Sequence, residues 1–127
     1  MIRNTLILPE GDAALAARLL QEAIDDLHVV TMLVFGRDRR SERIVRWADQ
    51  LCEKTRIAER FNLRRVVWIR KPGVKPLRAI LDPLLGAGST PAVAVLDFHD
   101  RVRAVLENAG EIDPLALEKA FLEGHAG

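Results

Sequence analysis

The strongest constraint on the fold is a continuous apolar run near the start of the chain. The run extends from His28 to Phe35, and Gly36 ends it. A strand with apolar residues on both faces needs cover on both faces, as in the centre of a parallel sheet. The run therefore predicts a buried central strand.

Shorter patterns on either side of this run alternate between strand and helix. Further strands are predicted at residues 5–8, 63–70, 91–98 and 101–106, the last two as a hairpin at a sheet edge. Apolar residues at helical spacing predict helices at residues 13–27, 41–61, 75–85 and 114–124. The resulting order, β-α-β-α-β-α-β-β-α, predicts one α/β domain over residues 1–127, with a mixed sheet and helices on both faces.

Local signals mark several helix ends. Asp12 and Asp113 precede helical patterns and are predicted to cap them, with Pro114 at the first helical position. Pro83 is predicted to interrupt or shift the third helix, because proline has no amide hydrogen to donate. Residues 125–127 are predicted to form a loose tail.

Composition excludes several classes of protein. The chain has 127 residues, of which 49% are hydrophobic, and this suits one globular domain and argues against disorder. No apolar run approaches the roughly 18–20 residues that span a bilayer, and the N-terminus lacks the pattern of a signal peptide. We therefore expect a cytoplasmic protein that does not enter a membrane.

Charge is distributed unevenly along the chain. The formal net charge is +1, but residues 37–78 carry fourteen Lys and Arg against five Asp and Glu, a balance of +9. The remaining residues carry a balance of −8. This asymmetry indicates either an anionic partner or pairing between the basic middle and the acidic flanks, within the fold or between copies of the chain.

The segment from Leu84 to Asp97 carries a family resemblance. It reads Leu-Leu-Gly-Ala-Gly-Ser-Thr-Pro-Ala-Val-Ala-Val-Leu-Asp, and together with the element order it resembles the thioredoxin-like superfamily. The resemblance implies a thioredoxin-like fold, a cis peptide bond before Pro91, and a groove beside Thr90 and Pro91. In the family, the backbone next to this proline pairs with extended peptide, which is a form of strand addition.

The chain departs from the redox pattern of that superfamily. Redox members carry Cys-x-x-Cys where the second strand meets the long helix, but residues 35–43 contain no cysteine. Cys52 is the single cysteine, and its place on an apolar helical stripe predicts a buried, inert thiol. Because dithiol exchange needs two thiols, we predict neither thioredoxin nor disulfide-isomerase activity within one chain.

Arginines gather at the junction where the cysteines would stand. Arg37, Arg39, Arg40 and Arg43 surround the start of the long helix, with Ser41 among them. Positive charge at a helix N-terminus is unfavourable, and such local conflict points to function. A phosphate, a carboxylate or an acidic protein surface would relieve it. The alternative is a solvated loop in which Asp38 caps the helix.

The remaining polar residues support other sites less well. Six more basic residues surround the strand at 63–70, with the first two expected to precede it: Arg64, Arg65, Arg70, Lys71, Lys75 and Arg78. Aromatic residues make up only 5% of the chain, so the stacking platform of a nucleic-acid-binding protein is not expected. The three histidines have no metal-ligand spacing, and no metal or cofactor is predicted.

Three functional hypotheses remain open. The first is a redox-inactive thioredoxin-like domain that acts as a protein-binding adaptor or assembly chaperone, through the groove at Thr90 and Pro91 and the Arg-rich helix start. Thioredoxin-like proteins without the dithiol include assembly factors, for example in hydrogenase maturation. The second is an enzyme or carrier that holds a small anion, phosphate or glutathione-like, at the same helix start. The third is a homo-oligomer in which basic and acidic surfaces pair. No catalytic constellation is recognisable, which favours binding over catalysis.

Overall fold

A computed structural model describes residues 4–26, 29–56, 63–99 and 101–126 of the chain. The strands are β1 (Thr5–Ile7), β2 (Val29–Phe35), β3 (Leu63–Ile69), β4 (Val93–Leu96) and β5 (Val102–Leu106). The helices are α1 (Ala13–Ile24), α2 (Arg39–Arg56), α3 (Lys75–Leu85) and α4 (Pro114–Ala126), with a short 3₁₀ helix, η1 (Ala109–Glu111), before α4. The α/β class is confirmed, and η1 is an element that the sequence pattern did not predict.

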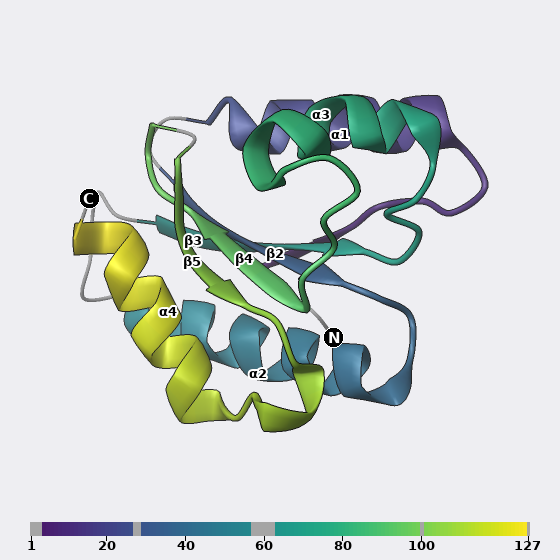
Figure 1. The fold of residues 1–127 in the computed structure, drawn as a ribbon. Helices are drawn as coiled ribbons and strands as arrows, with labels where there is room; N and C mark the ends of the chain where they lie inside the picture. Colours follow the sequence, from purple (N-terminus) through teal and green to yellow (C-terminus); the bar gives the residue numbers. More distant parts are fainter. Residues whose placement is uncertain (1–3, 27–28, 57–62, 100, 127) are drawn as a thin grey trace.

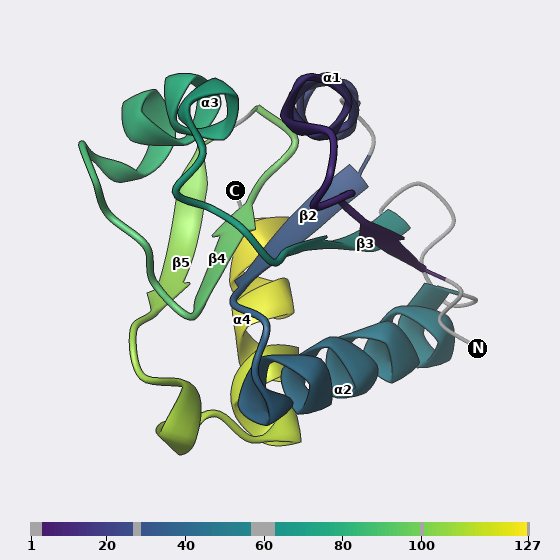
Figure 2. The ribbon, with the colours of Figure 1, turned by 90° about the vertical axis from the view of Figure 1, so that its right-hand side faces the viewer.

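The five strands form one mixed sheet in the order β1-β3-β2-β4-β5. Strands β1, β3 and β2 run parallel, whereas β4 runs antiparallel to both β2 and β5. All residues of β2 are buried, so the prediction of a buried central strand is confirmed. Figures 1 and 2 show β2 and β4 in the middle of the molecule, with helices above and below them.

The helices cover both faces of the sheet, as predicted. Helices α1 and α3 lie on one face, and α2 and α4 lie on the other (Figures 1 and 2). Consecutive strand residues point to opposite faces. In β2, Met32 and Val34 therefore join the core under α2 and α4, whereas Leu33 and Phe35 join the core under α1 and α3.

Both predicted aspartate caps are present. Asp12 Oδ1 accepts a hydrogen bond from the amide of Leu15 at 3.0 Å, and Asp113 Oδ1 accepts one from the amide of Ala116 at 2.8 Å. These bonds satisfy amide hydrogens that have no partner inside the helix.

Three predicted boundaries require comment. Helix α3 continues through Pro83 to Leu85, so the predicted interruption is wrong. Pro83 lies in the last turn of α3, where its missing amide removes only one bond of the ladder. Helix α2 begins at Arg39, and its predicted end at Phe61 falls outside the described residues.

The predicted loose tail is wrong for its first two residues, because α4 extends to Ala126. Its last turn lies close to the sheet: a Cβ atom added at Gly124 would sit 2.6 Å from Val30 Cγ1. The ring of His125 lies 5.8 Å from the ring of Phe98. Tertiary contacts therefore hold a segment that local sequence signals leave without a structure.

Among the described residues, no helix combines the length and the apolar content that a membrane crossing requires.

Candidate functional site

The turn between β2 and α2 is built around Gly36. Its φ is +114°, and a Cβ atom at this position would lie 2.4 Å from Ser41 Oγ. The amide of Gly36 donates to the carbonyl of Ile69 at 3.0 Å, and its carbonyl accepts from Trp68 Nε1 at 2.7 Å. These contacts fix the direction in which the chain leaves the sheet.

Asp38 caps α2. Its Oδ1 accepts hydrogen bonds from the amide and the hydroxyl of Ser41, both at 2.9 Å, and the hydroxyl also lies 3.1 Å from the carbonyl of Phe35. The hydrogen bond from the Ser41 amide, then that from its hydroxyl, lower the pKa of Asp38. The chain's own carboxylate thus occupies part of the helix N-terminus that would otherwise attract an anion. Ser41 itself is buried, so it lies beneath the surface that it supports.

Replacing Ser41 by Ala should raise the pKa of Asp38 toward the usual aspartate value of about 3.9, because one donor to its carboxylate is lost. A carboxyl group whose pKa is lower in the folded state stabilises the fold at pH values above its usual pKa. The contribution disappears as the pH falls through the lowered pKa. An NMR titration of the Asp38 carboxyl carbon measures this change. Ser89→Ala is the control with no expected effect, and an Asp38 pKa that does not move in Ser41→Ala would contradict the prediction.

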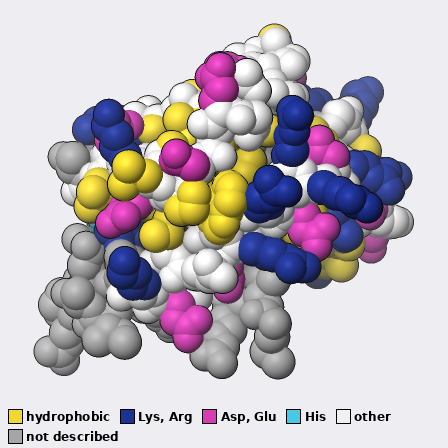
Figure 3. Space-filling model, turned by 90° about the horizontal axis from the view of Figure 1, so that it is seen from below, with side chains coloured by type: hydrophobic (Ala, Val, Ile, Leu, Met, Phe, Trp, Pro, Cys, Tyr) yellow, Lys and Arg dark blue, Asp and Glu magenta, His cyan; other side chains and the backbone are white. Residues whose placement is uncertain are grey.

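The arginines at this junction lie on the surface. Arg37, Arg39, Arg40 and Arg43 are all exposed, and Arg37 lies 3.5 Å from Glu10 Oε1. The other three form no ion pair with any residue in the described part of the chain. Figure 3, seen from the side of α2 and α4, shows Lys and Arg side chains gathered where α2 begins, beside hydrophobic side chains in the middle of this face.

A cleft separates the first turns of α2 from η1. It has a volume of about 240 Å³ and is lined by Arg40, Arg43, Ile44, Trp47, Ala109, Gly110 and Ile112. The guanidinium of Arg43 lies 6.0 Å from the centre of the Trp47 ring. The walls therefore combine two cationic groups with apolar side chains, which is a surface suited to an apolar side chain next to a carboxylate.

The segment at Thr90 and Pro91 lies beside this junction. The amide of Phe35, at the end of β2, donates to the carbonyl of Ala92 at 3.1 Å. Thr90 is exposed and Pro91 is buried. No peptide bond between described residues is cis, so the expected cis bond before Pro91 is corrected to trans. The trans form is the one that an X-Pro bond ordinarily favours, by about 0.5–1 kcal/mol.

Arg78 holds this segment in place. Its guanidinium donates to the carbonyl of Ser89 at 2.9 Å and to Thr90 Oγ1 at 3.3 Å, and it pairs with Asp82 at 2.6 Å. Asp82 also accepts from the amide of Gly88 at 3.1 Å, and this bond, followed by that from Arg78, lowers its pKa. The sequence placed Arg78 only within a basic group. The i, i+4 spacing of Arg78 and Asp82 is the signal that indicates their pairing.

Arg64 and Arg65 lie inside β3, as the predicted strand at 63–70 requires, and not before it. Arg64 is buried, with its guanidinium 5.7 Å from the ring centre of Phe121. Arg65 points to the opposite face, where it pairs with Asp26 at 3.6 Å and donates to the carbonyl of Ala23. Burial lowers the pKa of Arg65, and the charge of Asp26 opposes that effect. Adjacent strand residues point to opposite faces, so neither arginine contributes to one basic stripe.

Part of the basic middle is neutralised by the acidic N-terminal flank. Glu10 lies 3.5 Å from both Arg37 and Arg70, and Asp26 pairs with Arg65. Pairing within the fold therefore accounts for some of the charge asymmetry, but not for the arginines at the start of α2.

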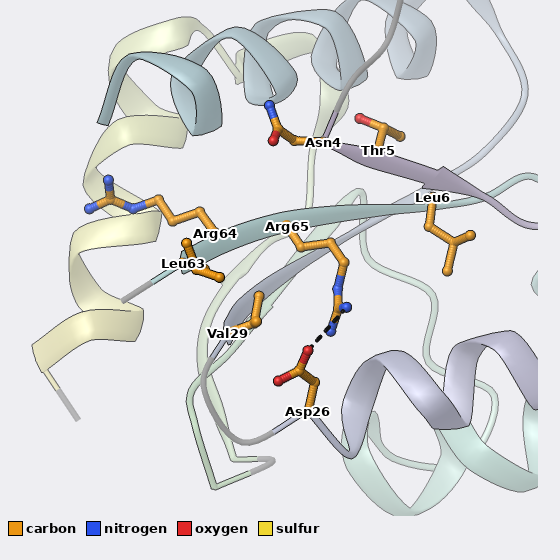
Figure 4. A pocket seen from close by; sticks show the side chains of 8 residues that line it. All are labelled: Asn4, Thr5, Leu6, Asp26, Val29, Leu63, Arg64 and Arg65. Atoms are coloured by element: carbon orange, nitrogen blue, oxygen red, sulfur yellow. Dashed lines mark ion pairs between the residues drawn. The ribbon is translucent and has the colours of Figure 1, made fainter. Parts of the chain in front are cut away.

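A hollow of about 430 Å³ lies at the edge of the sheet, near the starts of β2 and β3. It is lined by Asn4, Thr5, Leu6, Asp26, Val29, Leu63, Arg64 and Arg65. Figure 4 shows Arg65 reaching toward Asp26, while Arg64 extends the other way. Thr5 Oγ1 donates to Asp49 Oδ1 at 3.0 Å. The Arg65–Asp26 ion pair and the Thr5–Asp49 hydrogen bond therefore join different elements of the fold.

The remaining candidate groups show no assembled chemistry. Cys52 is fully buried, as predicted. Across the described residues, no three His, Cys, Asp or Glu side chains gather as metal ligands. No protein-family model, curated protein or solved structure matches this chain.

Proposed function

We propose that this chain is a thioredoxin-like domain without dithiol chemistry that binds another protein, as an adaptor or assembly chaperone. The thioredoxin-like assignment is supported by the strand order β1-β3-β2-β4-β5, with β4 antiparallel to its neighbours and helices on both faces. The absence of cysteine from residues 35–43 supports binding rather than redox catalysis.

One juxtaposition carries the proposal. The hydrogen bond between Phe35 and Ala92 joins the end of β2, which leads into the Arg-rich start of α2, to the segment that follows the exposed Thr90. The backbone of the Thr90 segment and the positive charges of the arginines are therefore both presented at this end of the sheet. A partner segment lying along Thr90 meets the arginines within the same surface.

The backbone of Thr90 is suited to strand addition. Neither its amide nor its carbonyl forms a backbone hydrogen bond with another described residue. The flanking residues are fixed, because Arg78 holds Ser89 and the amide of Ala92 donates to Leu106. A fixed segment with open backbone groups loses little conformational freedom when an extended peptide pairs with it.

The charge of the surface predicts the chemistry of the partner. Arg39, Arg40 and Arg43 have no ion-pair partner within the described residues, and guanidinium groups bind carboxylates through two parallel hydrogen bonds. We therefore propose an acidic segment of a protein. A small anion held by the helix start gains less support, because Asp38 already accepts the Ser41 amide.

Reversing two of these charges should abolish partner capture. The tagged chain is incubated with extract of its native host, and bound proteins are identified by mass spectrometry. Arg39→Glu with Arg40→Glu is expected to lose the main bound protein. Arg18→Glu with Lys75→Glu makes the same change in net charge at two exposed positions in α1 and α3 and should retain it. Equal capture by both double variants would remove the Arg-rich helix start from the proposal.

A second pair of variants tests the backbone of Thr90 in the same assay. Thr90→Pro removes the amide hydrogen that strand addition uses, whereas Thr90→Val keeps it and removes only the hydroxyl. Capture is expected to fall in Thr90→Pro and to persist in Thr90→Val, at equal melting temperatures. Loss in neither variant, or in both, would contradict strand addition at this position.

A further inference from the structure

The outer face of α4 carries an apolar stripe that the fold leaves uncovered. Leu115 and Leu122 are 74% and 54% exposed, the largest exposed fractions of the large hydrophobic residues described. They are seven residues apart, or about 10.5 Å along the helix, and so lie on one face. By contrast, Leu117 and Phe121 of the same helix are buried against the sheet.

Two opposite charges lie between these leucines. Glu118 and Lys119 follow Leu115 at i+3 and i+4, which places them on the same face of the helix. A shallow groove of about 470 Å³ runs along this face and is lined by Asp113, Leu115, Ala116, Glu118, Lys119 and Leu122. Neither Glu118 nor Lys119 forms an ion pair with another described residue.

We infer that this stripe is the interface of a homodimer in which two copies of α4 pack antiparallel. The order Leu115, Glu118, Lys119, Leu122 is self-complementary about a two-fold axis that passes between residues 118 and 119. Antiparallel packing sets Leu115 of one copy against Leu122 of the other, and Glu118 against Lys119, twice over. This matches the requirement of a two-fold interface, in which the same patch on both copies must fit itself.

The charges also select the orientation. Parallel packing of the same stripe sets Glu118 against Glu118 and Lys119 against Lys119, so both pairs repel. Antiparallel packing turns both into attractive pairs beside leucines that exclude water. A partner with another stripe gains nothing from this symmetry, so a second copy of the chain is the occupant that the pattern favours.

The inferred dimer leaves the proposed partner surface free. No residue of the stripe belongs to the α2–η1 cleft or to the segment around Thr90. Because one helix face is a small contact, we expect weak, concentration-dependent association rather than a permanent dimer. Each dimer then presents two partner surfaces, which raises the avidity for a partner with repeated acidic segments.

Sedimentation equilibrium over a wide concentration range tests the inference. The average mass of the purified chain should rise with concentration from 14.2 kDa toward twice that value. Leu115→Asp with Leu122→Asp should keep the chain monomeric at all concentrations, with an unchanged far-ultraviolet circular dichroism spectrum. A chain that stays monomeric without substitution overturns the inference, as does dimerisation that survives the double substitution.

Exchanging the two charges provides a matched control that does not depend on the leucines. Glu118→Lys alone and Lys119→Glu alone should each weaken dimerisation by roughly tenfold, because each makes the stripe repel itself. The double exchange, Glu118→Lys with Lys119→Glu, restores a self-complementary stripe and should restore the dissociation constant. An equimolar mixture of the two single variants should form heterodimers. If the double exchange is as weak as the single variants, antiparallel pairing is wrong.

Discussion

Replacing Phe121 by Ala should lower the free energy of unfolding by about 3–5 kcal/mol. Phe121 is 1% exposed and is among the largest side chains of the core under α2 and α4. Its removal leaves a cavity between α4 and the sheet, and it also deprives the buried guanidinium of Arg64 of the ring that lies 5.7 Å away. Losses of this size are a large part of the total stability of a domain.

The measurement is urea unfolding followed by circular dichroism, with a melting curve as a second readout. The melting temperature should fall by roughly 10–20 °C. Glu123→Ala is the matched control, because it truncates an exposed side chain in the same helix and should change stability by less than about 0.5 kcal/mol. A loss below about 1 kcal/mol in Phe121→Ala would contradict the packing of α4 against the sheet.

Replacing Gly36 by Ala should lower the free energy of unfolding by about 3 kcal/mol or more, for two separable reasons. The φ of +114° is strained for any residue with a Cβ atom, and the added carbon would lie 2.4 Å from Ser41 Oγ. Relief of that overlap displaces the Ser41 hydroxyl, and with it the bonds to Asp38 and Phe35.

Gly86→Ala separates the two reasons. Gly86 also has a positive φ, +99°, but no atom lies within 4 Å of a Cβ added there. Its replacement by Ala therefore reports backbone strain without that crowding, of about 1–3 kcal/mol. Urea unfolding of both variants gives the difference, which measures the crowding at Ser41. Equal losses in the two variants would show that the Ser41 contact does not constrain the junction.

The burial of the central strand could be predicted because its pattern leaves no alternative. Every residue of β2 is buried, and a run that is apolar on both faces has no other place in a layered domain. The caps at Asp12 and Asp113 were also predictable, because an aspartate immediately before a helical pattern acts through local hydrogen bonds. Sequence signals that act over a few residues, or over one whole strand, therefore predict the structure correctly.

Features that depend on distant residues were not predictable in the same way. The buried guanidinium of Arg64 lies 5.7 Å from the ring centre of Phe121, a residue far along the chain. The role of Glu10 depends equally on two arginines from other elements, Arg37 and Arg70. Nothing in the local sequence of these residues states which partners the fold will bring.

The same distinction between local and distant signals applies to the candidate site. The Arg-rich start of α2 and the Thr90 segment were both singled out from the sequence, and a hydrogen bond between Phe35 and Ala92 joins the strand ends next to them. The spacing of apolar residues predicts the last helix, but Leu115 and Leu122 of this helix face outward in the structure. Assigning each leucine to a face required the position of the sheet, because seven-residue spacing alone does not say which side is buried.

The position of β2 has a consequence for synthesis on the ribosome. This strand is made early, and β3 completes one of its edges, but its other edge pairs with β4, where Thr31 lies opposite Leu96. Until β4 emerges, a nascent chain carries an apolar strand with one open edge and no cover from α4. Open edges of this kind pair readily with other chains. Elongation between β3 and β4 is therefore the interval in which this chain is most exposed to aggregation and has the greatest need of a chaperone of its own.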